Sequence, residues 1–187
     1  MIRSSSSHHA VPKSVFHAAV GSGGGTVLTT GGTVSAAANA SSKASAGSVT
    51  VGVNAPITTT GAGAHGVVAQ SAAGGGGIVT NGTTTLFLSG NGGGSSHAVS
   101  VYVYAPITVS GAGASAVVAH STTDPVVEIA EGVVVTGAAD GHALLLDGPI
   151  NEVTNAGTLQ TFAGGDGLVI DSRIGDTTVT NKDHFHA

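Results

Sequence analysis

The sequence predicts an all-β fold made of stacked repeats, and three observations support this prediction. Residues 46–71 return fifty positions later as residues 96–121, with 15 of 26 residues identical and no gap. Short runs of Val and Ile alternate with polar residues, and glycine, which occurs 31 times in 187 residues, separates the runs. A repeat of this length, built from strand-like runs and glycine turns, is typical of a solenoid, in which each unit contacts its neighbours along one axis.

The composition indicates a narrow, ordered core. Aromatic residues make up 3 % of the chain and hydrophobic residues 41 %. Ala, Val, Ile and Leu therefore have to fill the interior in thin layers. Charged residues amount to only 8 %, which by itself can suggest disorder. Disordered chains, however, usually also have low hydrophobicity. Ordered β structure is the stronger interpretation.

The repeat divides the chain into segments. The first residues are polar and irregular, as is common for a terminus that is not tied to the fold. The predicted organisation is an N-terminal segment at 1–14, β-helical repeats over 15–181 (two copies at 15–64 and 65–114, then a diverged, more acidic copy at 115–181), and a tail at 182–187.

Each full repeat contains three predicted strands. Residues 49–53 and 99–103 place Val at every second position, the pattern of a strand with one buried face. A proline follows, then a short strand that ends at a Gly-Ala-Gly-Ala turn, then a third strand that begins Val-Val-Ala. We expect about three strands per coil and two coils of about 25 residues in each fifty-residue repeat. The side chains expected to point inward are Val49, Val51, Val53 and Ile57, and their partners Val99, Val101, Val103 and Ile107.

The C-terminal third keeps the strand pattern, and no segment of the chain predicts an amphipathic helix. The Ala-rich stretch at 36–40 is flanked by Ser, Thr and Gly and is interpreted as an insertion loop. Further strands are expected at 132–136, 143–147, 158–161, 167–171 and 177–181.

Charge and cysteine content exclude several classes of partner. The net charge of −5 argues against nucleic acid, whose binding needs a basic surface. All ten Asp and Glu lie at or beyond Asp124, so the first two repeats present a nearly uncharged surface. The chain has no Cys, hence no disulfide or thiolate site. No apolar run is long enough for a membrane span.

Two motifs in the repeats carry a resemblance to a known family. After Pro56, an Ile-Thr-Thr-Thr-Gly run is followed by Gly66-Val-Val-Ala-Gln-Ser and then by the polyglycine tract 74–77. Farther on, Asn155-Ala-Gly-Thr-Leu precedes Asp166-Gly-Leu-Val-Ile. Both resemble the repeats of bacterial autotransporter passenger regions. The resemblance covers about residues 15–181. It implies a right-handed parallel β-helix displayed at the outer membrane, often in adhesion or self-association.

The chain departs from that family in three ways. Residues 1–10 lack the apolar segment of a signal peptide. The C-terminal part lacks a series of alternating ten-residue strands, so we expect the translocator barrel elsewhere in the gene. The third copy has Thr122-Thr-Asp-Pro in place of polyglycine.

We therefore expect a non-catalytic passenger segment that acts at the cell surface as an adhesin or structural spacer. It is expected to contact itself or surface glycans and to use no cofactor. Two alternatives stay open, namely a β-helical polysaccharide-degrading enzyme and a non-functional fragment of a larger gene.

The enzyme alternative depends on three carboxylates, which are candidates for glycoside hydrolysis. Asp166, Asp171 and Asp176 are spaced by five residues, with Arg173 between them. An odd spacing places neighbours on opposite faces of an extended strand, whereas a glycosidase needs two carboxyl groups about 5–10 Å apart across a sugar. Glycines surround Asp166 and Asp176, so we interpret both as solvated turn residues and predict no catalytic residue.

Nine histidines raise the possibility of a metal site, which needs three or four convergent ligands. The terminal histidines have no preorganised partner, and His120 falls on Gln70 in the repeat, which suggests an exposed, interchangeable polar position. The histidines considered were His8, His9, His184 and His186 at the termini, and His65, His97, His120 and His142 within the repeats.

Phosphate and acyl chemistry find no support in the motifs. The glycine tracts at 23–25, 74–77 and 92–94 are not followed by the Lys-Ser/Thr or helix start of a phosphate loop. No Gly-x-Ser-x-Gly elbow occurs to position a serine nucleophile. We expect the tracts to be turns, and we predict no metal, cofactor or catalytic site.

Overall fold

The computed structural model describes residues 15–20, 25–28, 45–74, 77–80, 85–88 and 94–182. These residues form strands and turns without a helix, which confirms the predicted all-β class. The predicted N-terminal segment 1–14, the predicted loop 36–40 and all but one residue of the predicted tail lie outside the described residues.

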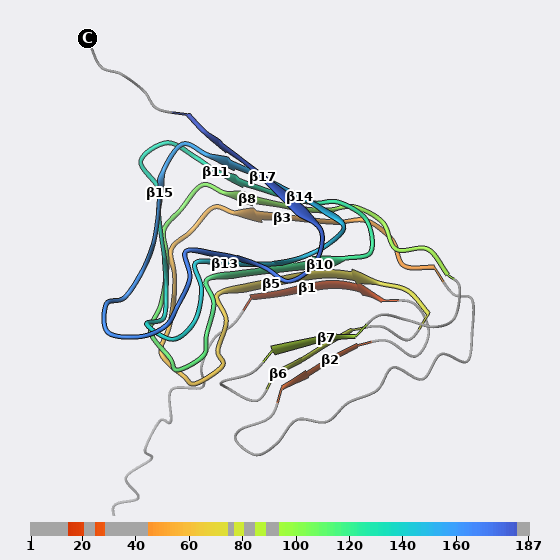
Figure 1. Ribbon diagram of the computed structural model, residues 1–187, viewed down its shortest axis with the longest axis horizontal. Helices are drawn as coiled ribbons and strands as arrows, with labels where there is room; N and C mark the ends of the chain where they lie inside the picture. The colour runs from red at the N-terminus through yellow and green to blue at the C-terminus, as the bar shows by residue number, and fades with distance from the viewer. Residues whose placement is uncertain are drawn as a thin grey trace, which may run out of the picture.

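Three parallel sheets enclose the core, and they are numbered here in the order in which one coil visits them. Figure 1 looks along the stack, so that the strands of each sheet lie behind one another. Sheet 1 holds β3 (Val49–Val53), β8 (Val99–Val103), β11 (Pro125–Ile129), β14 (Ile150–Asn155) and β17 (Asp176–Asn181). Sheet 2 holds β4 (Ile57–Thr59), β9 (Ile107–Val109), β12 (Val134–Gly137) and β15 (Thr158–Thr161). Sheet 3 holds β1 (Val15–Val20), β5 (Val67–Ala72), β10 (Val117–Ser121), β13 (Leu144–Asp147) and β16 (Ile170–Ser172).

This arrangement is a parallel β-helix, as the family resemblance implied. Successive strands along the chain belong to sheets 1, 2 and 3 in turn, and each strand pairs in parallel with the equivalent strand one coil away. The predicted number of three strands per coil is therefore confirmed.

The coil size differs from the prediction in the repeated part of the chain. Val49 pairs directly with Val99, and Val67 with Val117, so one fifty-residue repeat adds one coil rather than two. Between β5 and β8 the chain makes an excursion, whose described strands lie outside the three sheets. After β10 the chain returns to sheet 1 through three residues, and Val99 pairs with Pro125 at an offset of 26 residues. The third copy has thus lost the excursion and kept the coil.

The inward positions form ladders of small aliphatic side chains through the stack. Val51, Val101, Val127 and Val153 lie in register on sheet 1 and are at most 2 % exposed. Because side chains on a strand alternate between its faces, this ladder fixes which face of sheet 1 is internal. The predicted inward residues are confirmed: Val49, Val53, Val99, Val103 and Ile107 are also buried, and Ile57 is half-buried and packs on the core.

The Gly-Ala-Gly-Ala turn lies between sheets 2 and 3, and its stacking explains why the turn repeats. A Cβ on Gly111 would lie 1.8 Å from the carbonyl oxygen of Gly61 in the coil before it. Gly63 and Gly113 both have a positive φ, at 63° and 65°, which favours glycine. A side chain at Gly111 would therefore clash with the turn of the coil before it, and the two positive-φ glycines give both turns the same shape.

A fourth small sheet covers the outer face of sheet 3, which the sequence did not predict. It contains β2 (Gly25–Leu28), β6 (Gly77–Thr80) and β7 (Thr85–Leu88), with β6 and β7 paired as an antiparallel hairpin. Figure 1 shows this layer on the side of sheet 3 that faces away from the core. The hairpin comes from the excursion between β5 and β8. It brings Ile78 and Phe87 onto the outward side chains of sheet 3, namely Val68, Val118 and Leu145.

Candidate functional site

Polar side chains gather at the corner where sheet 3 passes to sheet 1. Ser71, the last residue but one of β5, and Ser121, the last residue of β10, lie in register one coil apart. The Ser71 hydroxyl donates to the Gly47 carbonyl at 2.8 Å and accepts from the His97 amide at 2.9 Å. The Ser121 hydroxyl donates to the His97 carbonyl at 2.9 Å. These hydroxyls connect successive coils through the backbone, which explains why serine recurs at this position.

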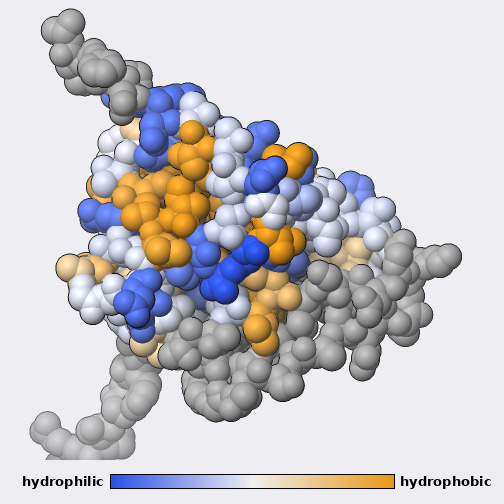
Figure 2. Space-filling view, in the orientation of Figure 1, coloured by the Kyte–Doolittle hydropathy of each residue, from blue (hydrophilic) through white to orange (hydrophobic). Residues whose placement is uncertain are grey.

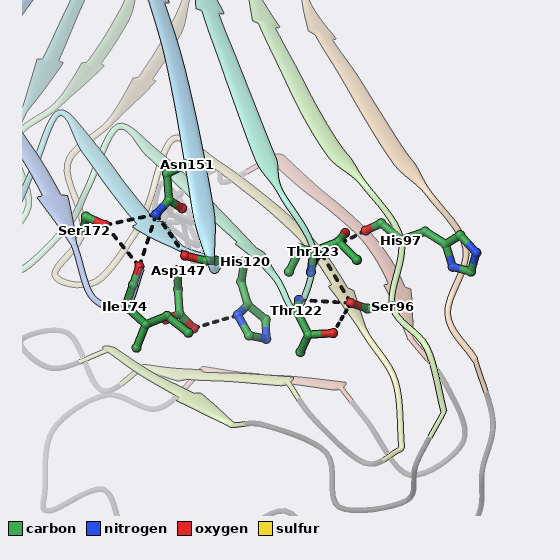
Figure 3. A network of polar contacts seen from close by, with 11 residues as sticks. Ser96, His97, His120, Thr122, Thr123, Asp147, Asn151, Ser172 and Ile174 are labelled. Atoms are coloured by element: carbon green, nitrogen blue, oxygen red, sulfur yellow. Dashed lines mark hydrogen bonds and ion pairs between the residues drawn. The ribbon is translucent and has the colours of Figure 1, made fainter. Parts of the chain in front are cut away.

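The neighbouring hydroxyls have the same structural use. Ser96 accepts the Thr122 amide at 2.9 Å and also contacts the Thr122 hydroxyl, and the Thr123 amide donates to Ser121 at 3.0 Å. Figure 3 shows this group beside sheet 1. A serine nucleophile needs a base aligned with its hydroxyl. Here the Ser71 and Ser121 hydroxyls are engaged with backbone groups instead.

In the later coils, Asn151 makes the polar contacts at this corner. Its buried Nδ2 lies 3.0 Å from both the Gly148 carbonyl and the Ser172 hydroxyl, and it also reaches the carbonyls of Ile174 and Asp176 at 3.2 and 3.3 Å. The amide therefore connects β14 to the turn that leads into β17 (Figure 3).

A buried His–Asp pair lies on the outward face of sheet 3. His120 Nδ1 is 2.8 Å from Asp147 Oδ2, and the two side chains are 2 % and 6 % exposed. The Phe87 ring of the hairpin stacks on the imidazole, with centroids 5.1 Å apart. The alignment of His120 with Gln70 is confirmed by the strand register. The predicted exposure of this position is wrong, because the hairpin covers it and both residues are buried.

The pair lacks the third member that acyl transfer requires. In a Ser–His–Asp triad, the second imidazole nitrogen meets the nucleophile. His120 Nε2 is buried and has no hydrogen-bond partner among the described residues. Phe87 stacks on one face of the ring. The arrangement orients an imidazole but offers no nucleophile to it.

His65 and His142 share one corner of the coil, just before sheet 3. His65 Nδ1 accepts the amide of Ser115 at 2.9 Å, and His142 Nδ1 accepts the amide of Leu168 at 3.2 Å. Each bond leads to the following coil and requires Nδ1 to be unprotonated. Burial lowers the pKa of His65 to about 4 and also lowers the pKa of His142. Both rings are therefore neutral connectors between coils at neutral pH.

A partly exposed group of ion pairs surrounds Asp171. Its Oδ2 lies 2.6 Å from Arg173 Nε and 3.4 Å from His142 Nε2. Asp171 is on β16 in register with Leu145, which places it on the outward face of sheet 3. Asp166 lies in the exposed loop before β16, and Asp176 is the exposed first residue of β17 rather than a turn residue.

The three candidate carboxylates thus form no common ion-pair group among the described residues. Asp171 forms its ion pairs with Arg173 and His142, and Asp166 and Asp176 make no ion pair among the described residues. No group of three or more His, Cys, Asp or Glu able to hold a metal occurs in the part of the chain that the structure describes. His8, His9, His184 and His186 lie outside that part.

The sequence did not reveal the polar contacts between coils, because they depend on register. The equal spacing of Ser71 and Ser121 was visible in the repeat. The pairing of His120 with Asp147 required knowing that sheet 3 continues at an offset of 27 residues after β10.

Comparison with protein-family models, with curated proteins and with solved structures finds no match for this chain. The class of protein is therefore defined by the fold alone, as a parallel β-helix. Within the described residues, no helix has the length and apolar character needed to cross a membrane.

Proposed function

We propose that this chain is a non-catalytic passenger segment of an autotransporter-like surface protein, in which the β-helix is both a spacer and an adhesive surface. The observation that carries the proposal is the continuous stacking of coils. The ladder from Val51 to Val153 runs through four coils without a break, and buried Ser, Asn and His side chains connect the coils at the corners. Such a structure holds distant surfaces apart and displays a regular face.

The outer face of sheet 1 is the surface best suited to weak adhesion. Thr50 and Ser100 stand in register on it, and they are followed along β8 by Tyr102. The rings of Tyr102 and Tyr104 lie nearly parallel, with centroids 6.4 Å apart, and Tyr104 is 54 % exposed. On β3 and β8 this face carries hydroxyl and aromatic groups without a charged side chain, which suit contacts with neutral glycans or with other uncharged surfaces. Glu128 and Glu152 stand on the same face in the two following coils. Repetition of weak contacts on one rigid surface raises their combined affinity.

The resemblance of the repeats to passenger regions supports the proposed cell-surface location, and display on cells tests it. We would fuse the chain between a signal peptide and a translocator barrel and measure protease accessibility and glycan binding on intact cells. The folded chain should be displayed. Tyr102→Ser with Tyr104→Ser should reduce binding while display stays unchanged, because both side chains are on the outer face. Val101→Asp, which places a charge in the core, should abolish display and serves as the misfolded control.

The alternative, a polysaccharide-degrading enzyme, depends on Asp171 and its partners. A glycosidase needs a second carboxyl group about 5–10 Å away across the sugar, whereas the partners of Asp171 Oδ2 are Arg173 and His142. The purified chain and Asp171→Asn should both release no reducing ends from a panel of polysaccharides. Release by the parent chain that Asp171→Asn abolishes would refute the non-catalytic proposal.

A further inference from the structure

The two ends of the stack differ in how well their inward side chains are covered. At the first coil, Val49, Val51 and Val53 are 7 %, 2 % and 5 % exposed, although β3 is the edge strand of sheet 1 among the described residues. At the other end, Val179 on β17 is 43 % exposed. Val179 is in register with Val153, which is 1 % exposed, so Val179 occupies an inward position of the same ladder.

The last coil presents an apolar end face. Figure 1 shows this end of the stack toward the viewer, and Figure 2 shows a group of apolar residues in the left part of the same face, bordered by polar residues. Large exposed apolar patches of this kind mark interaction surfaces. The apolar side chains of the last coil that are at least 41 % exposed are Phe162, Leu168, Val169, Ile174 and Val179. Ile150, also exposed, points to the outer face of sheet 1 instead.

Among the described residues, the strand at this end also has a hydrogen-bonding edge that pairs with no other strand. The amides of Asp176 and Lys182 donate to the Pro149 and Asn155 carbonyls, at 3.1 and 2.8 Å. Backbone groups alternate in direction along a strand. Thr177, Val179 and Asn181 therefore direct their N–H and C=O groups away from β14, toward the open edge. An open edge of this kind is a template for another strand.

We propose that a second copy of this chain covers the end face, with the two β17 strands paired antiparallel about a two-fold axis at Val179. In this register Val179 faces its own copy, and Thr177 faces Asn181 of the other copy. These residues are the ones whose backbone groups are free, so they form hydrogen-bonded pairs. The same register places Asp176 opposite Lys182 twice, once on each side of the axis.

A second copy is favoured over other partners by this complementarity. The segment 176–182 offers an acidic side chain at one end, a basic one at the other, and Thr and Val between them. Reversing its direction aligns opposite charges. A head-to-tail stack would need an open first coil as well, and the inward valines of β3 are already buried. A closed, isologous dimer is therefore expected rather than a filament.

A cysteine at the axis tests the geometry directly, since the chain has no cysteine of its own. The parent chain should sediment as a dimer at tens of micromolar. Val179→Cys should form a disulfide-linked dimer on mild oxidation, because residues facing each other across an antiparallel pair are within disulfide range. Thr50→Cys, on the exposed outer face of β3, is the matched control and should not crosslink. A monomer, a filament or equal crosslinking of both variants would overturn the proposal.

A charge reversal tests the register. Asp176→Lys should weaken the dimer roughly ten-fold, because it sets like charges opposite each other at two places. Adding Lys182→Asp should restore the parent affinity. Glu128→Lys makes the same charge change on sheet 1 away from the edge and should leave the dimer intact. If the double variant stays as weak as Asp176→Lys, the antiparallel register is wrong.

Discussion

His65 and His142 occupy the same corner of the β-helix two coils apart, and each accepts a backbone amide of the following coil through Nδ1. The second nitrogen of each ring also has a neighbour: Nε2 of His65 lies 3.4 Å from the Thr85 hydroxyl, and Nε2 of His142 lies 3.4 Å from Asp171. An imidazole is suited to this position because the neutral ring accepts at one nitrogen and donates at the other.

This arrangement predicts that acid destabilises the fold. The pKa of His65 falls from 6.5 to about 4 on folding, chiefly because the ring is buried. Above pH 6.5 the ring is neutral in both states and the full stability is present. As the pH falls from 6.5 toward 4, the unfolded chain takes up the proton first, and up to about 3 kcal/mol of stability is lost.

Urea unfolding at pH 7 and at pH 4.5 would measure this loss. His65→Asn removes the titrating ring and should flatten the pH dependence over that range. His142→Asn should flatten the pH dependence less. The pKa of His142 is also lowered, but its ring is partly exposed, so burial contributes less. An unchanged slope in His65→Asn would mean that another group carries the acid sensitivity.

The core ladders predict a strong contrast between two isoleucines. Ile107 is fully buried on sheet 2 between coils, whereas Ile150 begins β14 with 49 % of its surface exposed. Ile107→Ala should cost about 3 kcal/mol of unfolding free energy through lost burial and a residual cavity. Ile150→Ala should cost less than about 1 kcal/mol. Equal losses in chemical denaturation would contradict the assignment of inside and outside on these sheets.

The buried pair of His120 and Asp147 predicts non-additive substitutions. His120→Leu keeps a side chain of similar size under Phe87 but leaves the Asp147 carboxylate buried without its donor. This should lower the free energy of unfolding by about 3 kcal/mol. The double variant His120→Leu, Asp147→Leu removes the stranded charge and should recover most of that loss. A double-mutant cycle by thermal or urea unfolding measures the coupling. Simple additivity would show that the 2.8 Å contact contributes little.

The sequence predicted the strands and the inward residues of the repeated coils, because both depend on local alternation. In residues 49–53 and 99–103 valine recurs at every second position, and only a β-strand places residues with this spacing on one buried face. The prediction from sequence failed where the structure of a segment depends on residues distant in the chain. The hairpin β6–β7 lies in a Gly- and Thr-rich excursion whose strands are ordered by packing on Val68, Val118 and Leu145.

The same limit applies to the polar residues. His120 is polar and falls on Gln70 in the repeat, which locally indicates an exposed position, yet both are buried beneath that hairpin. The number of coils per repeat was overestimated for a related reason. A fifty-residue period is compatible with two coils or with one coil and an excursion, and only the direct pairing of Val49 with Val99 distinguishes them.

Asn151 predicts a substitution that changes charge and almost nothing in shape. Its Nδ2 lies within 3.3 Å of four oxygen atoms, three of them backbone carbonyls, and the side chain is fully buried. Asn151→Asp replaces the donor by a carboxylate oxygen that faces those acceptors, so at pH 7 it should cost about 3 kcal/mol.

Two further measurements separate this cause from a loss of packing. Protonation of the introduced carboxyl restores a donor, so the deficit of Asn151→Asp relative to the parent should shrink as the pH falls, in contrast to the effect expected at His65. Hydrogen exchange should show the amides of β17 losing protection before those of β10, since Asn151 connects β14 to the turn leading into β17. A deficit independent of pH would assign the loss to altered packing around Asn151 instead of to repulsion between oxygens.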